Sequence, residues 1–131
     1  MDAHQMVWNE KVAKEVITHL EKRRMGGSYA PTAAQAISEI VEMIPAGSTV
    51  FRCGSMSAVE MGLWEEIAKL PDVKIIDPFQ PDLSPAEGMA LRRQGLSADV
   101  MIASSNAITL DGKLVNLDGM GNRVAAMTFG P

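Results

Sequence analysis

The residues best suited to chemistry lie close together near the C-terminus. Between residues 104 and 123 the chain carries amides, carboxylates, hydroxyls and glycines at short spacing. Groups of this kind bind polar and anionic ligands, and a carboxylate among them can serve as a general base. A well-capped hairpin with solvated turns explains the same composition equally well. The residues concerned are Ser105, Asn106, Thr109, Asn116, Asp118, Gly119, Gly121, Asn122 and Arg123.

A β-hairpin is the element that would position this cluster. Asp111-Gly112 favours a tight two-residue turn, because both positions tolerate positive φ. That turn pairs Ile108 with Val115 on one apolar face, since side chains alternate between the faces of a strand. Asn116 and Asp118 would then gather near the open end of the hairpin, on its other face.

A glycine-rich turn follows the hairpin and leads into a helix. Gly119 and Gly121 give the backbone freedom to turn sharply. Asn122 and Arg123 begin a helix whose exposed N–H groups would point toward the polar cluster. The structural alternatives are turn and cap bonding for Asn116 and Asn122.

A second turn could also hold an anion. The predicted strand at residues 48–52 is followed by Cys53, Gly54 and Ser55, and Ser57 with Glu60 has the spacing of a capping box. A strand, a small-residue turn and a helix N-terminus can bind an anion through backbone N–H groups. Neither a Walker loop nor a dinucleotide fingerprint is present. An ordinary capped strand–helix junction is the commoner explanation.

Hydrophobic periodicity predicts an α/β fold. Strands and helices alternate along most of the chain, which favours three layers around a mainly parallel sheet. Ligands of such sheets lie beyond the carboxyl ends of the strands, so the turns after residues 52 and 103 should meet there. The predicted helices cover residues 5–25, 32–43, 58–70, 84–94 and 122–129, and the predicted strands cover residues 48–52, 73–77 and 99–103.

Composition narrows the class of protein. With 131 residues, 47% of them hydrophobic, the chain can build one domain with its own core. No run approaches the ~20 apolar residues of a membrane span, and the N-terminus lacks the order of a secretory signal, so the cytoplasm is the default location. One cysteine, Cys53, and two histidines cannot form a zinc or iron–sulfur site. The basic cluster at residues 22–24 complements a helix C-terminus and does not indicate nucleic-acid binding.

The chain resembles the LUD domain family, which includes the LutC/YkgG proteins of lactate utilisation. A second similarity lies at Gly54-Ser55 and residues 60–63, where Cys53 and Ser57 replace the glycine and threonine usual in the family. The strongest similarity lies in residues 106–109, 111–112, 114–119, 121–127 and 129–131.

The resemblance implies a fold and a function. Proteins of this family are similar to the NagB/RpiA/CoA-transferase fold, in agreement with the α/β prediction. They are associated with oxidation of L-lactate to pyruvate, beside partners that carry iron–sulfur clusters. We therefore expect a single domain that binds a small anionic metabolite, with an iron–sulfur subunit as a partner. We expect no cofactor or metal held by this chain, and no membrane or nucleic-acid partner.

On this reading the cluster becomes a substrate site. Arg123 would pair with a substrate carboxylate or phosphate, and Asp118 would be the general base. A structural salt bridge between these two residues is at least as strong an explanation. The remaining binding residues would be Gly54, Ser55, Ser57, Asn106, Thr109, Asn116, Gly119, Gly121 and Asn122.

Two other functions stay open. Fold analogy suggests a sugar-phosphate isomerase or a CoA-transferase-like enzyme, with Glu60 as the nucleophile, although fold does not establish function. The second open function is that of a non-catalytic assembly module. Family members usually continue past the Gly-Pro of residues 130–131 with an apolar strand. A chain that stops there would leave an unpaired edge or uncovered core, so we expect self-association.

Overall fold

The computed structural model describes residues 2–131, whose contacts divide the chain into two compact units. Unit 1 contains the chain up to Ser38 together with Ser105–Asn116. Unit 2 contains Glu39–Ser104 together with Leu117–Pro131. Each unit therefore combines two stretches that are far apart in the sequence.

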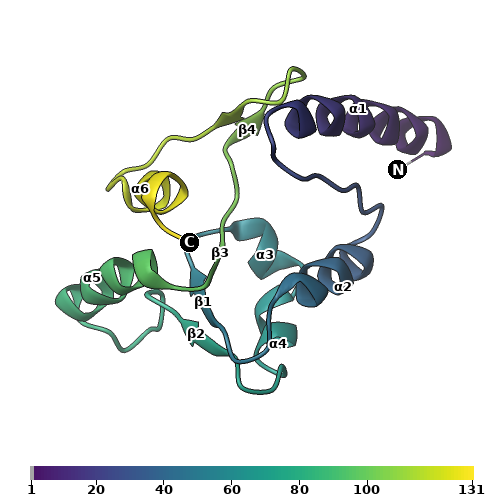
Figure 1. Cartoon of the computed structure of the whole chain (residues 1–131). Helices are drawn as coiled ribbons and strands as arrows, with labels where there is room; N and C mark the ends of the chain where they lie inside the picture. The colour runs from purple at the N-terminus through teal and green to yellow at the C-terminus, as the bar shows by residue number, and fades with distance from the viewer. Residues whose placement is uncertain (1) are drawn as a thin grey trace. The chain divides into compact units, whose positions relative to one another are not determined.

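A parallel sheet forms the centre of unit 2. β1 (Thr49–Arg52) lies between β2 (Lys74–Ile76) and β3 (Val100–Ile102), and both neighbours run parallel to it (Figure 1). Phe51 of β1 lies opposite Ile76 and Met101. Helices connect the strands, as parallel pairing requires. The prediction of an α/β fold with a mainly parallel sheet is confirmed.

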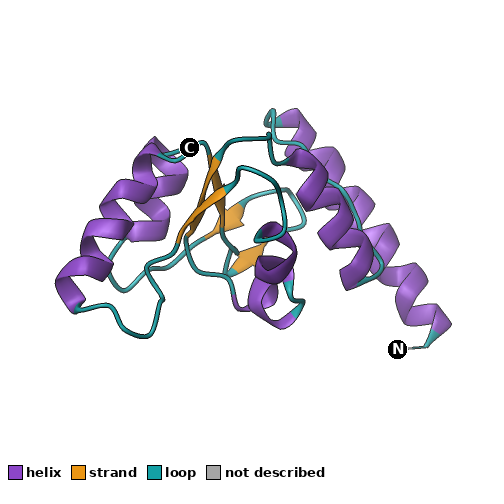
Figure 2. Cartoon of the chain, turned by 90° about the horizontal axis from the view of Figure 1, so that it is seen from below, coloured by secondary structure: helices purple, strands orange, loops and turns teal. Residues whose placement is uncertain are grey.

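Helices cover both faces of this sheet. α5 (Pro85–Gln94) and α6 (Asn122–Phe129) lie on one side, and α3 (Met56–Glu60) and α4 (Leu63–Ile67) lie on the other (Figures 1 and 2). Arg52 points to the α4 side, where its Cζ atom lies 5.2 Å from the centre of the Trp64 ring. Because alternate residues of a strand point to opposite faces, the opposite face of β1 carries Phe51 and Cys53. These two pack in a buried cluster with Ile76, Ala98 and Ala126.

The 3₁₀ turn Gly95–Ser97 brings the backbone against this cluster. A Cβ atom placed on Gly95 would lie 2.5 Å from the Phe51 ring. Only glycine therefore lets the backbone approach the ring this closely.

The helix starts follow local capping chemistry. Ser84 and Glu87 form a capping box at the start of α5, with both reciprocal hydrogen bonds present, and the helix begins where it was predicted. The predicted box at Ser57 and Glu60 is wrong. The helix begins earlier, at Met56, and Ser55 is its N-cap, with Oγ accepting the Ala58 N–H at 3.0 Å.

The predicted helix over residues 58–70 is interrupted. Gly62 takes a left-handed conformation with φ of 79° and separates α3 from α4. A glycine in this conformation ends one helix and caps the next. The continuous helix expected from periodicity is therefore wrong at this position.

Unit 1 contains α1 (Ala3–Lys22), the start of α2 (Ala33–Met43) and a hairpin. α1 ends earlier than predicted, because Arg24 turns left-handed with φ of 62° before Gly26 and Gly27 are reached. Arg23 donates from Nη2 to the Asp111 carbonyl at 3.1 Å. A Cβ atom on Gly112 would lie 2.9 Å from the His19 backbone. The hairpin loop therefore packs closely on α1 within this unit.

The predicted register of the hairpin is wrong by one residue. β4 (Ala107–Ile108) and β5 (Leu114–Val115) pair so that Ile108 lies opposite Leu114. Thr109 N–H donates to the Lys113 carbonyl at 3.0 Å, which leaves a three-residue loop. Gly112 has φ of 74° but Asp111 is not in the left-handed region, whereas a two-residue type I′ turn needs positive φ at both central positions.

Candidate functional site

The turns after β1 and β3 meet at the carboxyl edge of the sheet, as predicted. Gly54, with φ of 94°, turns the chain after β1. Ser55 Oγ lies 2.5 Å from Ser104 Oγ, which follows β3. Ser55 thus both caps α3 and joins the two turns. Ser57 is exposed in the first turn of α3 and Glu60 is exposed at its last residue.

Asp118 and Arg123 form an ion pair beside these turns. Arg123 Nε donates to Asp118 Oδ1 at 2.9 Å, and the two side chains are only 12% and 7% exposed respectively. Arg123 also donates from Nη1 to the Ser104 carbonyl and from Nη2 to the Leu117 carbonyl at 3.2 Å. The salt bridge that the sequence left as an alternative is therefore present, and together with the two bonds to carbonyls it engages all three nitrogens of the guanidinium.

Asp118 also caps α6. Its Oδ2 atom accepts the Val124 N–H at 2.6 Å, while the N-cap residue Gly121, with φ of 76°, offers no side-chain bond. The Val124 N–H bond, with a further contribution from Arg123, holds the pKa of Asp118 below its usual value. The N-terminus of α6 is therefore capped by the carboxylate of Asp118 rather than left open to the carboxylate of a ligand. A role for Asp118 as a general base stays a prediction, and the lowered pKa disfavours it.

A cleft of about 250 Å³ opens beside the ion pair. It brings together four of the predicted site residues, which are Gly54, Asp118, Asn122 and Arg123. We call it the Arg92 cleft, after a residue that the sequence analysis missed. Its remaining lining residues are Cys53, Phe79, Arg92 and Met120.

Arg92 differs from the other arginines of unit 2 that lie near this edge. Its Nε atom is buried, and among residues 2–131 no hydrogen bond or ion pair joins Arg92 to another residue. Its Cζ atom lies 5.4 Å from the centre of the Phe79 ring. Arg52, which also faces Phe79, is instead paired with Asp77 at 2.9 Å. Arg92 is therefore a cation in the cleft wall with no carboxylate to balance it.

The sequence offers one signal for Arg92. Gly88 stands one turn earlier in α5, and glycine inside a helix costs stability. A Cβ atom there would lie 3.0 Å from Arg92 Nη1. The glycine therefore makes room for the guanidinium to lie against its own helix.

Cys53 lines the cleft but is a poor nucleophile. The thiol is 2% exposed, and burial, together with the negative charge of Asp118, raises its pKa to about 11. Because the thiolate is the reactive form, Cys53 remains protonated at neutral pH. Within residues 2–131, no group of three or more His, Cys, Asp or Glu side chains is placed to hold a metal ion.

Three of the predicted binding residues belong to unit 1. Thr109 Oγ1 donates to Asp111 Oδ1 at 2.5 Å and accepts the Lys113 N–H at 2.9 Å, so it organises the hairpin loop. Asn106 N–H donates to the Val115 carbonyl at 3.0 Å. Asn116 has a buried Oδ1 atom without a hydrogen-bond partner among the described residues. The first two therefore have structural roles within the hairpin.

Gly119 and Gly121 lie in the turn before α6. A Cβ atom on either glycine would meet no other atom within 4 Å, but Gly121 needs its positive φ to begin the helix. Gly121 therefore has the conformational role that was predicted for it, while nothing packs closely against Gly119.

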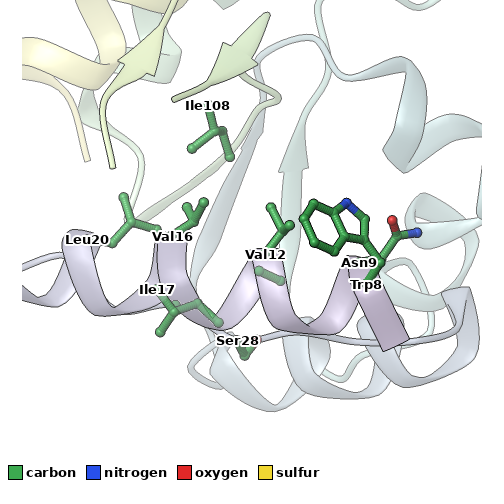
Figure 3. Close-up of a pocket in the computed structure, with 10 residues that line it drawn as sticks. Trp8, Asn9, Val12, Val16, Ile17, Leu20, Ser28 and Ile108 are labelled. Atoms are coloured by element: carbon green, nitrogen blue, oxygen red, sulfur yellow. The ribbon is translucent and has the colours of Figure 1, made fainter. Parts of the chain in front are cut away.

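Unit 1 has a hollow of its own, of about 370 Å³. Apolar side chains of α1 and Ile108 of β4 line it (Figure 3). No charged side chain lies among its lining residues, so it suits apolar contacts. The labelled residues are Trp8, Asn9, Val12, Val16, Ile17, Leu20, Ser28 and Ile108.

Comparison with known proteins gives one match. The sequence model described as the LUD domain matches residues 13–131. Neither the curated proteins nor the solved structures contain a match to this chain. Across the part of the chain that the structure describes, no helix combines the length and apolarity needed to cross a membrane.

Proposed function

Because the chain belongs to the LUD domain family, we propose that it acts in the cytoplasm as a component of a lactate-oxidising system and binds a small anionic metabolite in the Arg92 cleft. Lactate and pyruvate are the first candidates, since LUD proteins of the LutC type are associated with this oxidation. The observation that carries the proposal is Arg92, which lies partly buried in the wall of a cleft and has no ion pair and no hydrogen bond to another described residue.

A carboxylate would satisfy Arg92. Hydrogen bonds between a guanidinium and a carboxylate are charge-assisted and geometrically specific. Asn122 also lines the cleft, and no hydrogen bond of its side chain to another described residue is present. Its amide could bind the hydroxyl of lactate or the keto oxygen of pyruvate. Asp118 and Arg123 would fix the cleft's shape, because they are already paired with each other.

Binding rather than chemistry is the step that we assign to this chain. The redox step would belong to a partner subunit with iron–sulfur clusters, as the family association implies. The CoA-transferase alternative has weaker support, because Glu60 is exposed at the end of α3 and does not line the Arg92 cleft.

Thermal unfolding with a ligand panel tests the proposal. Lactate, pyruvate, sugar phosphates, CoA thioesters and nucleotides would each be added to the wild type, to Arg92→Ala and to Arg93→Ala. A ligand at ~100 times its dissociation constant adds ~2.7 kcal/mol of stability. We expect lactate or pyruvate to raise the Tm, with the shift lost in Arg92→Ala only. Arg93 is the matched control, because it is the next residue of α5, is exposed and does not line this cleft.

The panel has three contrary outcomes. A shift with sugar phosphates or CoA thioesters alone would favour the isomerase or transferase alternative. Equal loss in both arginine variants would show non-specific attraction. No shift with any ligand would remove the support for a metabolite site.

The apolar hollow of unit 1 favours one second candidate, an assembly module. Trp8 is 62% exposed and Ile108 is 53% exposed beside it. Exposed apolar patches of this kind often mark contacts between proteins. An iron–sulfur subunit or a second copy of this chain would be the partner. Light scattering across a dilution series and co-purification with the subunit, for wild type and Trp8→Ser, would test it. A constant monomeric mass and no retained subunit would count against this candidate.

A further inference from the structure

A second hollow adjoins the Arg92 cleft. Its volume is about 170 Å³, and it shares Arg92, Met120 and Asn122 with the cleft. The shared residues place the two hollows side by side, with Arg92 and the start of α6 between them. We call the second hollow the annex. Its other lining residues are Met89, Arg93, Leu96, Gly121 and Ala125.

The annex is chemically unlike the cleft. Apart from the two arginines and Asn122, its side chains are the apolar Met89, Leu96, Met120 and Ala125. Methionine is flexible and polarizable, so it adapts to apolar groups of varied shape. No acidic side chain is among the lining residues. An apolar surface therefore continues directly from the position of an unpaired cation.

We propose that the ligand of this chain is a 2-hydroxy or 2-oxo monocarboxylate that carries an apolar tail of several carbons. Its carboxylate binds Arg92, and its tail lies in the annex against Met89, Met120 and Ala125. Lactate is then the shortest member of the ligand class rather than the preferred one. This inference rests on the proposed function, because both use the same Arg92 cleft.

Charge and shape together favour this occupant. Arg92 has no ion pair with another described residue. Its unbalanced charge attracts an anion, while the apolar lining of the annex favours removal of hydrocarbon from water. A three-carbon acid would gain only from the attraction between charges, whereas a long-chain acid would gain from both the charges and the burial of its hydrocarbon tail.

A series of straight-chain 2-hydroxy acids tests the inference. Titration calorimetry on the full chain would compare lactate with its homologues up to 2-hydroxyoctanoate at constant ionic strength. Burial of one methylene contributes ~0.8 kcal/mol, which corresponds to about a fourfold gain in affinity. We expect a gain of up to about fourfold per added methylene, ending when the annex is full.

Three variants locate the tail. Ala125→Phe adds a ring inside the annex and should remove the dependence of affinity on chain length. Thr128→Phe is the matched control, because Thr128 is exposed on the same helix and does not line the annex. Met89→Gln makes the annex more polar without added bulk, so it should reduce the gain per methylene even if the phenylalanine variant does not fold.

The outcomes separate the inference from the proposed function. If lactate binds through Arg92 with the same affinity as its longer homologues, the proposal that a tail binds in the annex is contradicted, and the proposed function stays intact. A dependence on chain length that survives both Ala125→Phe and Met89→Gln would place the tail elsewhere and also overturn it. If Arg92→Ala leaves lactate binding unchanged, the proposed function fails, and the inference fails with it.

Discussion

Removing the Asp118 carboxylate should strongly destabilise unit 2. The carboxylate accepts the Val124 N–H as a helix cap, and a cap contributes about 1 kcal/mol to the free energy of unfolding. It also accepts a charge-assisted hydrogen bond from Arg123, and such a bond contributes about 1.5–3 kcal/mol. With side chains only 7% and 12% exposed, water replaces these bonds poorly. Asp118→Ala should therefore lower the free energy of unfolding by roughly 3 kcal/mol, or the Tm by roughly 10 °C.

Urea and thermal unfolding followed by circular dichroism at neutral pH would measure this loss. Glu66→Ala is the control, because it removes an ion pair with Lys69 whose side chains are 45% and 68% exposed. Pairs this exposed contribute little, so the control should lose less than about 0.5 kcal/mol. The reasoning is refuted if Asp118→Ala loses no more than the control.

The same variant predicts a dependence on pH. The folded-state pKa of Asp118 lies below its unfolded value, so its stabilisation is complete above pH ~4 and is lost as the pH falls through the folded pKa. The difference in free energy of unfolding between wild type and Asp118→Ala should stay constant from neutral pH to about pH 5 and shrink below that. A difference that grew toward low pH would contradict the assigned ion pair.

Three further predictions concern the core and the turn after β1. Gly95→Ala should cost about 1–3 kcal/mol in urea unfolding, because its Cβ atom would lie 2.5 Å from the Phe51 ring; no loss would contradict this close packing. Iodoacetamide should alkylate Cys53 at least about 100-fold more slowly in the folded chain than in urea, since its pKa is raised from 9.0 to about 11; equal rates would show an accessible thiolate. Ser55→Ala should cost about 1 kcal/mol and Ser57→Ala less than about 0.5 kcal/mol, because Ser55 is the cap; the reverse order would restore the original capping prediction.

Local signals predicted the fold well where a single interaction decides the structure. The Ser84–Glu87 box fixes the start of α5, and the short apolar run after Asp99 contains the parallel strand Val100–Ile102, whose residues are half-buried. The hairpin register was missed because the Thr109 hydroxyl bonds both Asp111 and Lys113. These groups are visible in the sequence, but the two-residue and three-residue loops differ only slightly in free energy, so the sequence alone does not show which one forms.

The candidate site was predicted only in part. Residues that follow strands, such as Gly54, or that start a helix, such as Asn122, reach the cleft because topology alone brings them there. Arg92 could not be predicted in this way. It and Arg93 are adjacent and identical in type, and only the packing of α5 decides which of them lines the Arg92 cleft. The ion pair of Asp118 and Arg123 was one of two open alternatives, and the structure contains it; binding of a substrate by Arg123 stays a prediction.

The composition of unit 1 sets an order of events during synthesis. α1 is complete when Lys22 has been made, but the hairpin that packs on it ends at Asn116. At ~5–20 residues per second the delay is roughly 5–20 s. Throughout that time Trp8, Val12 and the other apolar side chains around the hollow are without Ile108, and chaperones that bind exposed apolar helices could hold them. Unit 1 is therefore completed only when the hairpin pairs and packs on the helix that was made first.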